Sequence, residues 1–222
     1  MSTNQILLKI FKTLLKSFGE RHWWPGETPL EIVVGALLTQ NTSWKNVEKA
    51  INNMKKEGVL DVERLYRIDN ERLSEIIRPS GFFNIKSNRL KNIVNVIYNK
   101  YSAKIENMIN VDADLLRVEL LNVNGIGPET ADSILLYALN KPVFVVDAYT
   151  KRFLKNHKLY NGDYDYHDIQ KFFMDNLPHD TYLFNEFHAL IVYLCQIHCK
   201  KTPICTGCPL EDDMVNRITA HG

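Results

Sequence analysis

The sequence predicts an all-α protein. Ten glycines and eight prolines stand among its 222 residues, and so few turn-forming residues favour helices over a many-stranded sheet. Apolar residues recur at helical spacing along most of the chain. The best strand candidate, Val143–Val146, is too short and too isolated to build a sheet.

The helical pattern begins near the N-terminus. Ile6, Ile10 and Leu14 belong to one apolar stripe, and similar stripes occur at 32–37 and 93–97. The same periodicity predicts further helices over 44–57, 70–78, 85–101, 113–121, 128–139, 147–156, 165–176 and 180–197.

The composition excludes several classes of protein. With 45% hydrophobic and 24% charged residues, wholesale disorder is excluded. No apolar run approaches the roughly 18 residues that would span a bilayer, and the first residues lack the cleavage site of a signal peptide. We therefore expect a soluble, cytoplasmic protein without a membrane partner.

The distribution of charge bears on nucleic-acid binding, because the net charge of +1 neither requires nor excludes it. Basic residues gather around Lys86–Lys91 and Lys151–Lys158, whereas 161–186 is acidic. One basic and one acidic face would suit a DNA-binding protein. The alternative is an ordinary solvated surface.

The segment Leu120–Ala131 carries the strongest local signal. A predicted helix ends near Leu121, Gly125 and Gly127 flank one apolar residue, and Pro128 opens the next helix. Glycines permit positive φ and let a ligand approach the backbone, and amides at a helix start attract anions. The pattern predicts a helix-hairpin-helix that grips a nucleic-acid backbone without reading sequence. The alternatives are a plain helix connection or, less well supported, a dinucleotide-binding loop.

Asp147 lies twenty residues beyond the hairpin, between an apolar run and a predicted helix. The simplest role for an aspartate at that position is an N-cap. The functional alternative is a catalytic carboxylate. Breaking a base–sugar bond builds positive charge on the deoxyribose, which a carboxylate stabilises, or it takes a proton from the attacking water.

These features together resemble the endonuclease III, or HhH-GPD, superfamily of DNA glycosylases. The shared features are the Leu-x-x-Val-x-Gly-Ile-Gly hairpin at 120–127, the following helix, Val146-Asp147 and a C-terminal cysteine cluster, and the resemblance covers roughly 25–210. It implies that Asp147 is the catalytic aspartate. It also implies a monomer that binds double-stranded DNA containing a damaged base.

The resemblance further implies two helical lobes with a DNA-binding cleft between them. Residues 26–140 would form a helical-barrel lobe that carries the hairpin. Residues 1–25 plus 141–222 would form the second lobe, with the cysteine loop near its end. Lys151, just after Asp147, would contact DNA.

Glu129 departs from the pattern of the bifunctional members of the superfamily. Those members carry a lysine at this position, in a Gly-x-Lys-Thr-Ala context, which attacks the sugar to form a Schiff base. A carboxylate cannot form an imine. The resemblance therefore implies a monofunctional glycosylase without AP-lyase activity.

The details are most similar to the 3-methyladenine DNA glycosylase III type. Trp23-Trp24-Pro25, Leu38–Thr42 followed by Trp44, Pro79–Phe82 and Glu129 carry this similarity. An alkylated purine is positively charged, and aromatic faces attract it. The three tryptophans would therefore form the base pocket; alternatively, they pack in the core.

Four other residues are candidates for contact with the DNA. Phe82 would enter the gap that a flipped base leaves, with Lys86 behind it at the phosphates. The alternative for Phe82 is a plain apolar turn. Gln40 or Asn41 would plug the duplex from the other side.

The cysteines are spaced Cys195-x₃-Cys199-x₅-Cys205-x₂-Cys208. Many superfamily members bind a 4Fe–4S cluster through Cys-x₆-Cys-x₂-Cys-x₅-Cys, and this chain has Met214 at the last position. Cys195 lies one helical turn before Cys199 and would supply the missing thiolate. We expect a structural 4Fe–4S cluster. Zinc is the second choice of metal, and four reduced thiols without metal are the alternative.

The sequence thus predicts base excision repair of alkylated, 3-methyladenine-like purines by a DNA glycosylase. Two other functions stay open. One is a monofunctional glycosylase for uracil or mismatched thymine. The other is a non-catalytic helix-hairpin-helix protein that binds DNA, for which a carboxylate at Asp147 has no use.

Overall fold

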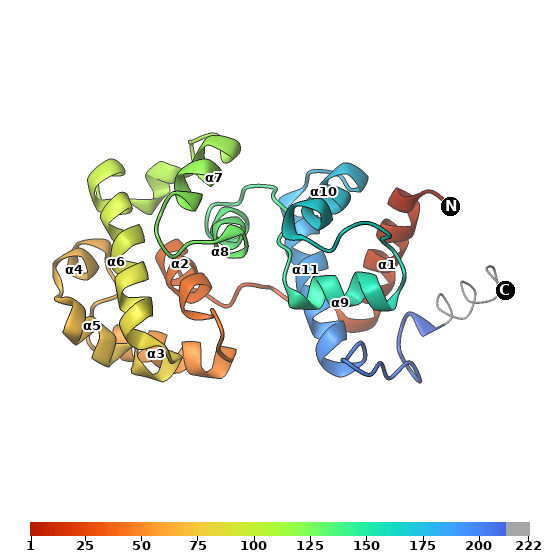
Figure 1. The fold of residues 1–222 in the computed structure, drawn as a ribbon, viewed down its shortest axis with the longest axis horizontal. Helices are drawn as coiled ribbons and strands as arrows, with labels where there is room; N and C mark the ends of the chain where they lie inside the picture. Colours follow the sequence, from red (N-terminus) through yellow and green to blue (C-terminus); the bar gives the residue numbers. More distant parts are fainter. Residues whose placement is uncertain (212–222) are drawn as a thin grey trace. The chain divides into compact units, whose positions relative to one another are not determined.

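The computed structural model describes residues 1–211, and within this range the regular structure is entirely helical. The chain divides into two compact units (Figure 1). Met1–Trp23 and the chain from Pro142 onward form the first, which we call the terminal unit. Trp24–Lys141 form the second, which we call the central unit.

The terminal unit is built around one long helix. α1 and α9 both pack against α11, and α1 also contacts α10. The helices of this unit are α1 (Thr3–Phe18), α9 (Ala148–Asn156), α10 (Tyr166–Asn176) and α11 (Thr181–Ile197).

The core of the terminal unit is aromatic. The rings of Phe144 and Phe173 stack at 4.0 Å between centroids, and Phe184 meets Phe144 edge-on. Glu186 of α11 is buried, and its carboxylate accepts hydrogen bonds from the amides of Arg21 (2.7 Å) and His22 (3.0 Å). This carboxylate ties the segment after α1 to α11.

The central unit has the helix α2 at its centre. α2 contacts α3, α6, α8, η2 and η3. The elements of this unit are α2 (Pro29–Leu38), α3 (Trp44–Lys56), α4 (Val62–Arg67), α5 (Asn70–Ile76), η1 (Arg78–Ser80), α6 (Phe83–Lys100), η2 (Ile105–Met108), α7 (Ala113–Leu121), α8 (Pro128–Ser133) and η3 (Ile134–Ala138).

The sequence of α2 explains its central place. The Thr28 side chain caps the helix by accepting from the amide of Glu31, and Pro29 takes the first position. Residues 33–38 are all buried. A helix that is apolar on every side lies in the core.

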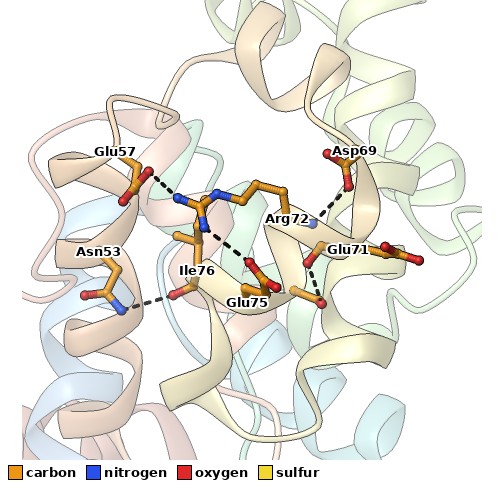
Figure 2. A network of polar contacts seen from close by, with 8 residues as sticks. Asn53, Glu57, Asp69, Glu71, Arg72, Glu75 and Ile76 are labelled. Atoms are coloured by element: carbon orange, nitrogen blue, oxygen red, sulfur yellow. Dashed lines mark hydrogen bonds and ion pairs between the residues drawn. The ribbon is translucent and has the colours of Figure 1, made fainter.

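A surface network joins α3 to α5 (Figure 2). The Arg72 guanidinium forms ion pairs with Glu57 at 2.7 Å and with Glu75 at 3.2 Å. Beneath it, the Asn53 side chain donates to the carbonyl of Ile76 at 3.1 Å. Exposed ion pairs individually contribute little to the free energy of unfolding. We therefore expect this network to influence the relative orientation of α3 and α5 more than the stability of the protein.

The all-α prediction is confirmed, with three local differences. α4 was not predicted, because it has only six residues. The helix predicted over 128–139 changes at Ile134 into a π-helical turn, which ends at Ala138. Residues 143–146 belong to no helix and pair with no strand in the described part of the chain. No helix within residues 1–211 combines the length and hydrophobicity needed to cross a membrane.

Candidate nucleic-acid interface and active site

The predicted hairpin is formed by α7, the turn 122–127 and α8. Asp112 caps α7 through the amides of Asp114 and Leu115. The turn is closed by a hydrogen bond from the amide of Ile126 to the carbonyl of Val123 (3.0 Å), and both side chains are buried. The apolar residues of the turn therefore anchor it, while its glycines lie outside the core.

The two glycines of the turn serve different needs. Gly125 has φ +96°, and a Cβ there would lie 2.1 Å from Cγ of Arg89. The fold itself thus requires glycine at this position. Gly127 has φ −94°, and a Cβ there would meet no atom within 4 Å. The fold therefore does not require glycine at 127.

Gln40 braces the turn, and its predicted place in a DNA duplex stays a prediction. Its side-chain nitrogen donates to the carbonyl of Gly125 (3.2 Å) and to the Thr130 hydroxyl (2.9 Å), and its oxygen accepts from Arg89. Both polar atoms of this half-buried side chain are therefore engaged within the central unit. Asn41 is exposed and adopts φ +53°, so of the two it is the one presented to solvent.

Lys86 is buried, so the prediction of a phosphate contact is wrong. Its side chain is 2% exposed, and its ammonium donates to the carbonyls of Leu38 (2.8 Å) and Ser80 (2.7 Å). Burial, followed by the repulsion of Arg89, lowers the pKa of Lys86 to about 8. The lysine satisfies two helix ends instead of reaching solvent.

Phe82 occupies the exposed turn before α6. It has φ +47° and is 65% exposed, which is unusual for an aromatic side chain. Glu129 is exposed in the first turn of α8, and Lys151 is half-buried in the first turn of α9.

Two of the three tryptophans meet in the central unit. Trp24 lies edge-on to Trp44 and tilted against Tyr137, with centroid distances of 5.3 Å in each pair. Gly35 of α2 lies beneath them, where a Cβ would come within 3.0 Å of Nε1 of Trp24. Trp23 belongs to the terminal unit. The base pocket of all three tryptophans stays a prediction.

The hairpin helices are joined by an ion pair. Arg117 of α7 donates through Nε to Asp132 of α8 at 2.7 Å and through Nη2 at 3.0 Å. The Asp132 side chain is fully buried. A two-point contact of this kind fixes the relative orientation of α7 and α8.

Asp147 is the N-cap of α9, as the sequence predicts. Its Oδ1 accepts from the amide of Thr150 (2.7 Å) and from the Thr150 hydroxyl (3.0 Å). Its Oδ2 lies 3.6 Å from Nε2 of His188 on α11. Burial raises the pKa of Asp147, but His188 and Thr150 outweigh burial and hold it below the ordinary value of 3.8. The group is therefore a carboxylate at neutral pH.

The cysteines are arranged in two sets. Cys199, Cys205 and Cys208 line one small cavity together with His157, His198 and Glu211. Cys195 is not in its lining; it is buried in α11, where its thiol donates to the carbonyl of Tyr149 at 3.5 Å. A hydrogen bond from Cys195, helped by His157 and Asn156, lowers the pKa of Cys199 against the effect of burial. That same bond, with burial, raises the pKa of Cys195.

The described residues do not gather all four cysteines around one cavity, and the four-thiolate site stays a prediction. In the described part of the chain, no three His, Cys, Asp or Glu side chains form a group that could hold a metal ion. The cavity has a volume of about 20 Å³, enough for about one water molecule. Cys195 is buried in α11 and forms a hydrogen bond with Cys199 instead of lining the cavity. Met214, the position of the last family cysteine, lies outside the described residues.

Sequence reasoning missed three members of these sites. Tyr137 reaches Trp24 from a π-helical turn, and no sequence pattern marks such a turn. Arg89 supports the hairpin from a distant helix. His188 had one usable signal: it is a histidine within a helix whose neighbours are almost all apolar, where a buried polar side chain needs a partner.

The comparisons with known proteins agree with this geometry. A family model described as the HhH-GPD superfamily base excision DNA repair protein matches residues 34–179. A Methanocaldococcus jannaschii protein, provisionally described as a DNA repair glycosylase, is 49% identical over 210 residues, covering 94% of this chain and 95% of its own.

Solved structures are similar over nearly the whole chain. The 3-methyladenine DNA glycosylase of H. pylori, solved with 1,N6-ethenoadenine, has a TM-score of 0.75 at 33% identity and covers 88% of this chain and 98% of its own. An endonuclease III–DNA complex has a TM-score of 0.80 at 21% identity and covers 99% of this chain and 100% of its own. At this identity the likeness is evidence for the fold alone. The chain therefore belongs to the HhH-GPD superfamily of base excision DNA repair proteins, and it is a DNA glycosylase.

Proposed function

We propose that this glycosylase hydrolyses the N-glycosidic bond of alkylated purines such as 3-methyladenine. The observation that carries the proposal is the contact of Trp24 with both Trp44 and Tyr137. Aromatic faces attract a base that bears delocalised positive charge. The 33% identity to the 3-methyladenine glycosylase of H. pylori supports the same substrate class.

Asp147 is proposed as the catalytic carboxylate. Its low pKa keeps it ionised, so it can stabilise the positive charge that develops on the sugar or accept a proton from water. Only one carboxylate oxygen is used for capping. The other oxygen, Oδ2, takes no part in capping and is the one proposed to face the reaction.

Gly127, Asn41, Phe82 and Lys151 are the proposed DNA contacts. Gly127 leaves open space beside the turn, which lets a phosphate approach the backbone. Asn41 and Phe82 are exposed at positive φ, as expected for side chains that enter a duplex around an extruded base.

Glu129 supports a hydrolytic reaction without AP-lyase activity. The position where bifunctional members carry lysine holds a carboxylate, which cannot form a Schiff base. Borohydride trapping with lesion-bearing DNA should therefore yield no covalent complex. A trapped complex in the wild-type protein would overturn the monofunctional proposal.

The decisive experiment measures base release from duplexes containing 3-methyladenine, 1,N6-ethenoadenine, uracil opposite guanine, or thymine opposite guanine. We expect release of the alkylated purines. Release of uracil or thymine alone would contradict the proposed substrate, and binding with no release from any duplex would identify a non-catalytic DNA-binding protein.

The role of Asp147 is tested with a matched pair of variants. Both Asp147 and Asp180 cap helices of the terminal unit, and asparagine caps as well as aspartate. We expect Asp147→Asn to lower single-turnover excision by about 100-fold or more, with binding to abasic-site DNA retained. Asp180→Asn should leave excision unchanged. Equal excision activity of the two variants would show that Asp147 only caps its helix and is not catalytic.

A 4Fe–4S cluster at the cysteine loop stays a prediction, supported by the three cysteines that line one cavity. Iron and zinc analysis of anaerobically purified protein tests it. The Cys205→Ser variant should lose any bound metal, and a wild-type protein without iron or zinc contradicts the prediction.

A further inference from the structure

Asp147 differs from the other capping aspartates in how its carboxylate is used. Within residues 1–211, six helices begin at an aspartate whose side chain accepts from a backbone amide: Asp61, Asp69, Asp112, Asp147, Asp165 and Asp180. At Asp147 one oxygen does all the capping, and the second oxygen lies 3.6 Å from Nε2 of a buried histidine. A cap alone does not need this second partner.

His188 is held firmly where it meets this oxygen. It lies in the middle of α11, which packs directly against α9. Its side chain is 5% exposed and that of Asp147 is 15% exposed. The ring of Phe144 stands nearly perpendicular to the imidazole, at 84°. The imidazole therefore has little freedom to turn away from Asp147.

The pairing answers a physical requirement of the reaction. A carboxylate that stabilises a cation must itself stay charged, and removal from water opposes that charge. Besides burial, the groups that act on the Asp147 carboxylate are His188 of α11 and Thr150 of α9. Thr150 contacts the capping oxygen, so His188 is the partner of the oxygen that is left for chemistry.

We propose that His188 is the positioning residue of Asp147: its imidazole pairs with Oδ2 and keeps the carboxylate ionised and in one orientation. This inference rests on the proposed function of Asp147 in excision. It assigns His188 no contact with the substrate. The consequence is that the loss of His188 changes the acid limb of the pH–rate profile.

The test compares His188→Gln with His179→Gln. Glutamine keeps a hydrogen-bond donor but cannot carry the charge. His179 is exposed in the same unit and contacts the carbonyl of Met174, so its variant controls for the substitution itself. Thermal unfolding first establishes that both variants fold.

Two measurements test the proposal, and the first of them does not depend on enzymatic activity. A ¹³C NMR titration of the Asp147 carboxyl should show its pKa raised by about one unit or more in His188→Gln and unchanged in His179→Gln. The acid limb of single-turnover excision should move up in pH by the same amount, with full recovery in alkaline buffer. An unmoved Asp147 pKa and an unmoved acid limb would overturn the inference.

The outcomes separate this inference from the proposed function. If Asp147→Asn abolishes excision while His188→Gln changes neither readout, Asp147 is catalytic and the pairing is refuted. If His188→Gln raises the pKa of Asp147 but Asp147→Asn excises normally, the pairing exists and the catalytic role fails. If His188→Gln does not fold, the wild-type titration decides, because an Asp147 pKa at or above its ordinary value contradicts the pairing.

Discussion

The side-chain nitrogen of Gln40 lies 3.2 Å from the carbonyl oxygen of Gly125 and donates a hydrogen bond to it. This contact links the segment after α2 to the turn of the helix-hairpin-helix, across 85 residues of sequence. The turn that is proposed to hold DNA is thus supported from the core helix of its own unit.

Replacing Gln40 with methionine should loosen the turn. The variant keeps the side chain's bulk but removes the hydrogen bonds to Gly125, Thr130 and Arg89. We expect a loss of about 2 kcal/mol in the free energy of unfolding, measured by urea denaturation. Gln196→Met, at an exposed position of α11, should change it by no more than about 0.5 kcal/mol. Equal effects would show that the brace contributes nothing.

Alanine at the two hairpin glycines should separate folding from DNA binding. The Gly125→Ala variant must adopt a positive φ, and its added Cβ clashes with the aliphatic part of the Arg89 side chain. We therefore expect it to destabilise the protein by about 2 kcal/mol. Gly127→Ala should leave the melting temperature nearly unchanged but weaken binding to an undamaged duplex, measured by fluorescence anisotropy. Unaltered DNA affinity in Gly127→Ala would argue against a phosphate contact there.

The ion pair inside the hairpin should matter more than a pair on the surface. Asp132→Asn leaves Arg117 facing a neutral, fully buried partner, and we expect it to cost about 3 kcal/mol of stability. Asp175→Asn breaks the exposed pair with Lys171 and should cost less than about 1 kcal/mol. Chemical denaturation of both variants checks this, and similar costs would contradict it.

Lys86 should make stability depend on pH. Its pKa is about 8 in the folded state against 10.5 ordinarily, so between these values the unfolded chain binds more protons and stability rises with pH. Relative to Lys86→Met, the wild-type protein should gain about 2 kcal/mol between pH 7 and pH 10. Urea denaturation of both proteins at the two pH values measures this, and a constant difference would show that Lys86 keeps its ordinary pKa.

Much of the architecture could be predicted from the sequence. The helices follow from apolar spacing, and their starts follow from caps such as Thr28 and Asp147, because both signals act between residues close in the chain. The hairpin was also predictable, because glycine at 125 is typical of a turn with positive φ and proline at 128 is typical of the first position of a helix. The resemblance to the superfamily, which rests on these local motifs, pointed to Asp147.

The tertiary structure decided which side chains meet. Lys86 and Gln40 were expected at DNA, yet one is buried against Leu38 and Ser80 and the other holds Gly125. The approach of Tyr137 to Trp24 had no counterpart in the sequence pattern. The apolar neighbours of His188 indicated that it needs a partner, but they did not indicate Asp147. Helix periodicity determines which face of a helix is buried, but the partner of each polar group on that face is chosen only when distant helices pack.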